Sequence, residues 1–80
     1  SYFARGSGKV STRLDEIRVT DARPAPGTQA LLLRFHWMET LRCRPRCRLH
    51  RTPIPHDEAG FITVVGQPRL PREFVIENVY

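Results

Sequence analysis

The chain has 80 residues and a formal net charge of +5, and its positive charge comes from twelve arginines and a single lysine, Lys9. A chain of this length forms one small domain with a limited core, so covalent or quaternary support for the fold is expected. No apolar run approaches the roughly 18 residues that a membrane-spanning helix needs, and the N-terminal residues lack the apolar centre of a signal peptide.

The N-terminal segment has the composition of a linker. It contains Gly6, Gly8 and several serines, which predicts a flexible leader over residues 1–12 and a single β domain over residues 13–80. The next segment, LDEIRVTDA, alternates apolar and polar residues around Ile17 and Val19, which indicates a first strand. RPAPGT, with its two prolines and one glycine, then predicts a loop.

The segment ALLLRFHWMETLRC, residues 30–43, gives the clearest pattern in the chain. Its large apolar residues fall on alternate positions, and the polar residues between them fall on the other face, which predicts one long strand. After the RPR turn, CRLHRTPI continues the alternation until the prolines end it. We expect a hairpin over residues 31–54, in which Cys43 faces Cys47, Leu41 faces Leu49 and Arg42 faces Arg48.

The C-terminal part of the chain predicts two more strands, FITVV and FVIENVY, separated by the loop GQPRLPRE. No stretch shows the three-four apolar spacing of an amphipathic helix. The sequence therefore predicts an all-β fold, a small antiparallel β-sandwich or barrel of about five strands.

Cys43 and Cys47 flank the turn CRPRC, and several chemistries fit this spacing. Cross-strand neighbours lie close enough for a disulfide, which is the interpretation we favour. A zinc site would combine the two cysteines with His50 and His56, although Cys47 and His50 point to opposite faces of a strand. Redox catalysis usually needs two intervening residues and a following helix, and two reduced thiols are a further alternative. We expect no metal and no cofactor.

Four arginines alternate through the same turn. Like charges that face each other are unfavourable unless an anion lies between them, so this cluster is a candidate anion-binding site, with a solvated loop as the alternative. We find no nucleophile placed with a base and no glycine-rich phosphate loop, and we expect no catalytic residues and no enzyme activity. The candidate anion-binding residues are Arg42, Arg44, Arg46 and Arg48.

The order LLLRFHW, loop, AGFITVVG and REFVIENVY resembles the small β-sandwich that ends some bacterial multispanning membrane proteins of the glycosyltransferase type. The resemblance covers roughly residues 17–80, and CRPRC stands where such domains often have a glycine-bearing turn. It implies an accessory domain on the periplasmic side, and no catalytic residue carries over, because the chemistry of those proteins belongs to membrane-embedded segments.

These observations lead to one expected function and one alternative. A disulfide, and a chain that begins at Ser1 instead of Met, indicate an extracytoplasmic domain of a secreted or membrane-anchored parent, or a processed chain. The resemblance implies that the parent is a bacterial membrane protein, with this domain at its periplasmic or extracellular face. We expect a non-catalytic extracytoplasmic domain that contacts an anionic glycan, a lipid headgroup or another domain of its parent. The alternative is a nucleic-acid-binding β-barrel with reduced or zinc-bound cysteines, which the apparent lack of exposed aromatics disfavours.

Overall fold

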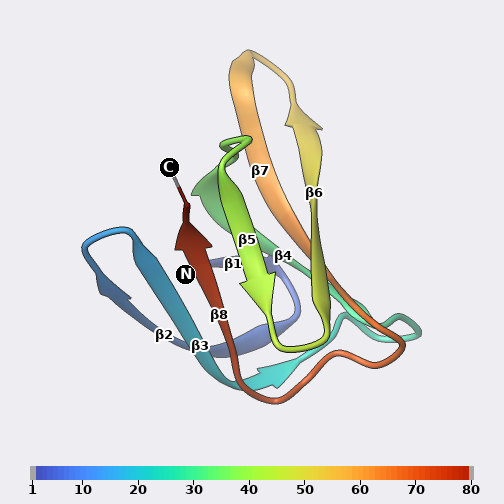
Figure 1. Ribbon diagram of the computed structural model, residues 1–80. Helices are drawn as coiled ribbons and strands as arrows, with labels where there is room; N and C mark the ends of the chain where they lie inside the picture. Colours follow the sequence, from blue (N-terminus) through green and yellow to red (C-terminus); the bar gives the residue numbers. More distant parts are fainter. Residues whose placement is uncertain (1, 80) are drawn as a thin grey trace.

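The computed structural model describes residues 2–79, so Ser1 and Tyr80 lie outside the described residues. Two four-stranded antiparallel sheets pack together as a β-sandwich (Figure 1). One sheet has the strand order β1-β4-β7-β6 and the other β2-β3-β8-β5. The strands are β1 (Phe3–Arg5), β2 (Ser7–Arg13), β3 (Glu16–Arg23), β4 (Ala30–His36), β5 (Leu41–Arg44), β6 (Cys47–Ile54), β7 (Asp57–Gly66) and β8 (Phe74–Asn78).

The core lies between the four inner strands. From one sheet, β4 and β7 contribute alternate side chains, and from the other sheet β3 and β8 do the same. Burial of each such side chain stabilises the fold by about 1.5 to 3 kcal/mol, so these positions carry most of the stability. The side chains with at most 1% of their surface exposed are Val19, Leu31, Leu33, Ile62, Val64, Phe74 and Ile76.

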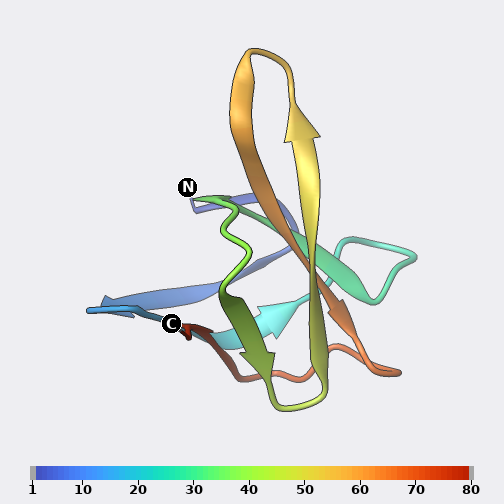
Figure 2. The same ribbon diagram turned by 45° about the horizontal axis from the view of Figure 1, so that its top comes forward.

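Only two connections between described strands stay within one sheet. The β2–β3 and β6–β7 hairpins extend from the body of the sandwich in different directions (Figure 1, Figure 2), and every other connection crosses between the sheets. The β1–β2 crossing needs glycine, because a Cβ on Gly6, whose φ is 80°, would lie 2.7 Å from the carbonyl oxygen of Arg23. The chain therefore links the two sheets at several points.

The all-β sandwich predicted from the sequence is confirmed, but it has eight strands instead of about five. Part of the difference comes from residues 3–12, which were predicted as a flexible leader and instead belong to β1 and β2, paired with β4 and β3. Both are edge strands and bury few side chains, so their composition resembles that of a linker.

The predicted hairpin over residues 31–54 is wrong. The segment over residues 30–43 divides into β4 and β5, which lie in different sheets, with Trp37–Thr40 between them. β5 pairs with β8 and β6 pairs with β7, so Arg42 faces Glu77 while Arg48 faces Val65. The prediction failed because β4 and β5 both face the same core, so their alternation continues from one strand to the next. A period of two identifies the buried face of a strand but does not identify the neighbouring strand.

Candidate functional site

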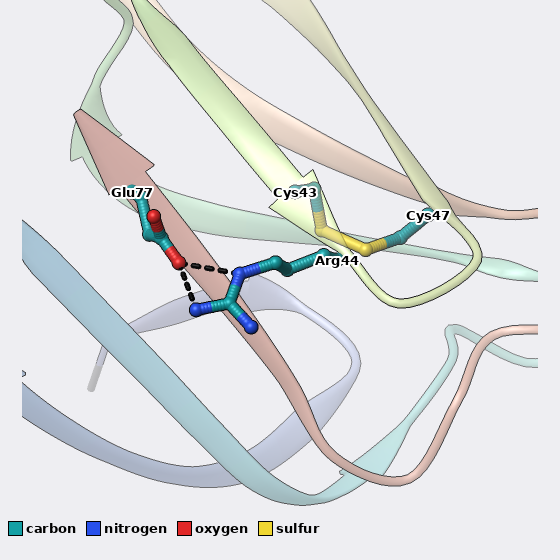
Figure 3. Close-up of a disulfide and its surroundings, with 4 residues drawn as sticks. All are labelled: Cys43, Arg44, Cys47 and Glu77. Atoms are coloured by element: carbon teal, nitrogen blue, oxygen red, sulfur yellow. Dashed lines mark hydrogen bonds and ion pairs between the residues drawn. A yellow bond between two sulfur atoms is a disulfide. The ribbon is translucent and has the colours of Figure 1, made fainter. Parts of the chain in front are cut away.

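The two cysteines connect the sheets at one edge of the sandwich. Their sulfur atoms are 2.07 Å apart and their Cα atoms 5.5 Å apart, as a disulfide requires (Figure 3). The predicted pairing is therefore met, but the bond joins β5 of one sheet to β6 of the other, and not two strands of one ladder. His50 is exposed on β6 and His56 lies in the β6–β7 turn, and the sulfurs are bonded to each other, so the zinc arrangement is not formed.

Beside the disulfide lies an open groove, which we call the β5–β6 groove. β5 and β6 are edge strands, and each pairs with only one neighbour, so the space between them is not closed by a ladder. The groove has a volume of about 350 Å³. Its polar and aromatic lining comes from Trp37, Glu39, Arg42, Arg48 and Gln67, with the disulfide also in the wall.

Two of the four candidate arginines line this groove from different sheets. Nη1 of Arg42 donates to the carbonyl oxygens of Leu41 at 2.8 Å and Glu39 at 3.1 Å, which holds its guanidinium near the groove wall. Arg48 reaches Gln67, whose side-chain oxygen, when turned toward it, accepts from Nε and Nη2 at 3.0 Å each. Both arginines are exposed and retain free donors for a ligand.

The other two arginines do not line the groove. Arg44 forms an ion pair with Glu77 on β8, and its side chain extends across the strands toward that carboxylate (Figure 3). Arg46 lies in the turn with φ 53°, and its carbonyl oxygen accepts from the backbone N–H of Gln67 at 2.9 Å. The cluster read from the sequence thus separates into two groove arginines, one paired arginine and one turn arginine.

Sequence reasoning missed three lining residues. Trp37 packs against the core, as the alternating pattern predicted, and its remaining surface forms part of the groove wall, which the sequence did not indicate. Glu39 lies between β4 and β5, in a segment that we predicted as strand. Gln67 follows β7, far from the cysteines in sequence, and only the packing of that loop on the β5–β6 turn brings it to the groove. No local motif marks it.

The groove combines chemistries that suit binding. Two guanidinium groups offer planar pairs of donors to a carboxylate or phosphate, the indole offers an apolar face, and the amide of Gln67 and the carboxylate of Glu39 offer further hydrogen bonds. Comparison with known protein families, with curated proteins and with solved structures finds no match. Within residues 2–79, no helix is long and apolar enough to cross a membrane.

Proposed function

We propose that this domain is a non-catalytic interaction module of a larger bacterial membrane protein, and that it binds an anionic glycan in the β5–β6 groove. The observation that carries the proposal is the convergence of Arg42 and Arg48, from two different sheets, on a groove that also contains Trp37. A small number of polar groups around an apolar face is typical of small-molecule sites.

The choice of an anionic glycan follows from the lining. An indole face packs against the apolar side of a sugar ring, while the hydroxyl groups of the ring can bond to Gln67 and Glu39. The two arginines favour a sugar that bears carboxylate or phosphate groups. The net charge of +5 adds long-range attraction for such a ligand.

The location that we propose is the extracytoplasmic face of the membrane. Its support is the pairing of Cys43 with Cys47, because disulfides persist in oxidising compartments and are rare in the cytosol. The disulfide also contributes to the site, since it holds the edges of the two sheets together where the groove opens.

Isothermal titration with a short oligogalacturonate at low salt tests the proposal. We expect the wild-type domain to bind, and the double variant R42Q/R48Q to bind at least about tenfold more weakly, because each lost charge-assisted hydrogen bond weakens binding by about that factor. R13Q/R34Q is the matched control, since both arginines are exposed and no hydrogen bond or ion pair to either side chain is found within residues 2–79.

Equal losses in the two double variants would contradict the proposal, because they would show that only net charge matters. Preference for random oligonucleotides over the oligogalacturonate would favour a nucleic-acid-binding domain instead. Binding only to vesicles that contain phosphatidylglycerol would make the ligand a lipid headgroup.

A further inference from the structure

Arginines from distant parts of the chain gather at one end of the sandwich. This end consists of the β5–β6 turn, the β7–β8 loop and the last residue of β3 (Figure 1), and we call it the basic end. Carboxylates also lie at or near this end: Glu73 is exposed, Asp21 pairs with Lys9 at 3.4 Å, and Glu77 pairs with Arg44. Its arginines are Arg23, Arg44, Arg46, Arg48, Arg69 and Arg72.

The β7–β8 loop, residues 67–73, is held at both of its ends. The backbone N–H of Gln67 donates to the carbonyl oxygen of Arg46 at 2.9 Å, and the N–H of Ala22 donates to that of Arg72 at 2.8 Å. In the middle, the N–H of Leu70 donates to the side-chain oxygen of Gln29 at 3.0 Å. The loop therefore fixes its two arginines relative to β3 and to the β5–β6 turn.

A second cavity lies at the far end of this loop. It has a volume of about 320 Å³ and is lined by Asp21, Ala22, Arg23 and Arg72. Arg23 and Arg72 are both exposed, and no side-chain hydrogen bond or ion pair to either is found within the described part of the chain. Two arginines and one carboxylate, Asp21, line this cavity, so its lining keeps a net positive charge that a bound anion would balance.

We propose that the glycan is a linear polyanion that runs from the β5–β6 groove along the β7–β8 loop to the Arg23–Arg72 cavity. This inference rests on the proposed function and names the length and charge pattern of its ligand. Gln67 lines the β5–β6 groove, and Arg72 lines the Arg23–Arg72 cavity. Five peptide units join these two residues, so their Cα atoms are at most about 18 Å apart. Arg69 lies between them.

A chain of acidic sugars fits this arrangement better than a flat membrane does. Both sites are concave, and each contains two arginines and one carboxylate, so each keeps a net positive charge that matches a ligand with repeated negative charges. Of the exposed large apolar side chains, Leu14, Met38 and Val79 lie at the opposite ends of β3, β5 and β8. The fourth in the described part of the chain, Tyr2, stacks on Phe35 near the C-terminal end of β4. The basic end thus lacks the apolar groups that insert into a bilayer.

A length series of oligogalacturonates tests the inference. We expect affinity to rise with length until the ligand spans both cavities. The variant R23Q/R72Q should then bind long oligomers about tenfold more weakly than wild type, while its affinity for a dimer stays within about twofold. R13Q/R34Q again serves as the control for the loss of two charges.

The outcomes separate this inference from the proposed function. If R23Q/R72Q and R13Q/R34Q bind long oligomers equally well while R42Q/R48Q weakens binding, the second cavity is not part of the site and the inference fails alone. If no variant differs from wild type, or no oligomer binds, both proposals fail. If phosphatidylglycerol vesicles bind and long oligomers do not, the extended ligand is not a glycan.

Discussion

The two ends of the sandwich are built by the same strands but carry different surfaces. At the basic end, arginines surround the Arg23–Arg72 cavity, and the β5–β6 groove runs from this end along β5 to Trp37 and Glu39. At the opposite end, Leu14, Met38 and Val79 are exposed, and an opening of about 410 Å³ is lined by the core residues Ile62 and Ile76 together with charged residues around the β2–β3 turn. The core constrains the inward side chains of both ends alike, so the difference lies in the loops. Loops on a rigid scaffold commonly carry function, and here they carry the charge.

The loops of the basic end are held in place by a covalent bond and by backbone hydrogen bonds. A disulfide closes the β5–β6 turn, and the Arg46 and Arg72 carbonyls hold the two ends of the β7–β8 loop. A site fixed in this way loses little entropy when a ligand binds, which favours affinity. The following variants break or sharpen the contrast between the two ends.

Replacement of Gly66 by alanine should have the largest effect. An added Cβ would lie 2.0 Å from the backbone nitrogen of Leu70, so the β7–β8 loop cannot keep its path. We expect a loss of about 3 kcal/mol or more in the free energy of unfolding, measured by urea denaturation, together with loss of glycan binding.

Gly27 supplies the control for that variant. Its φ is 78°, but a Cβ there would meet nothing within 4 Å, so alanine should cost only about 1 kcal/mol of backbone strain. If both variants lose the same free energy of unfolding, the close approach of the β7–β8 loop to Gly66 is not the reason that glycine is needed there.

Removal of the disulfide in C43A/C47A should cost about 2 kcal/mol in unfolding free energy, because the bond closes a short loop and restricts the unfolded chain only modestly. The edges of the two sheets should also separate more easily, which should weaken binding of the oligogalacturonate. An unchanged urea midpoint would mean that the disulfide does not support the corner between the sheets.

The variant E77Q should have a smaller effect. It releases Arg44 from its ion pair, and because the Arg44 side chain is exposed and water screens the pair, the loss of stability should be below about 1 kcal/mol. The freed arginine makes the basic end more positive, so affinity for a long oligogalacturonate should rise at low salt. A fall in affinity would indicate that Glu77 itself contributes to the binding surface.

The variant L14S should have the smallest effect. Leu14 is 92% exposed at the β2–β3 turn, so its replacement should change the unfolding free energy by less than about 0.5 kcal/mol. Glycan affinity should stay at the wild-type value. A clear loss of glycan affinity would show that the binding surface lies at the end of the sandwich that bears Leu14, in contradiction to the proposal.

The sequence predicted the parts of the molecule that depend on local pattern. Alternation identified Leu31 and Leu33 as inward-facing, and the short spacing of Cys43 and Cys47 indicated their pairing. It could not predict the edge strands β1 and β2, because a strand that buries few side chains lacks a strong alternation. The pairing of β5 with β8 could not be predicted either, because alternation does not identify the neighbouring strand.

The candidate site was predictable only in part. The arginines of the CRPRC turn are adjacent in sequence, so their clustering was evident, although Arg44 and Arg46 do not line the groove. Arg23 and Arg72 meet only because the β7–β8 loop bonds to β3, a long-range contact that no local motif announces. Residues that only the topology brings together can be identified only from the structure.

The most direct test of the central claim is a two-dimensional amide NMR titration of the wild-type domain with a long oligogalacturonate. We predict shifts of the Trp37 indole N–H and of the backbone amides of Arg48, Gln67 and Arg72, with the amides of Arg13 and Leu14 in the β2–β3 hairpin unchanged. Shifts confined to the β2–β3 hairpin, or no shifts at all, would contradict the claim that the β5–β6 groove and the basic end bind an anionic glycan.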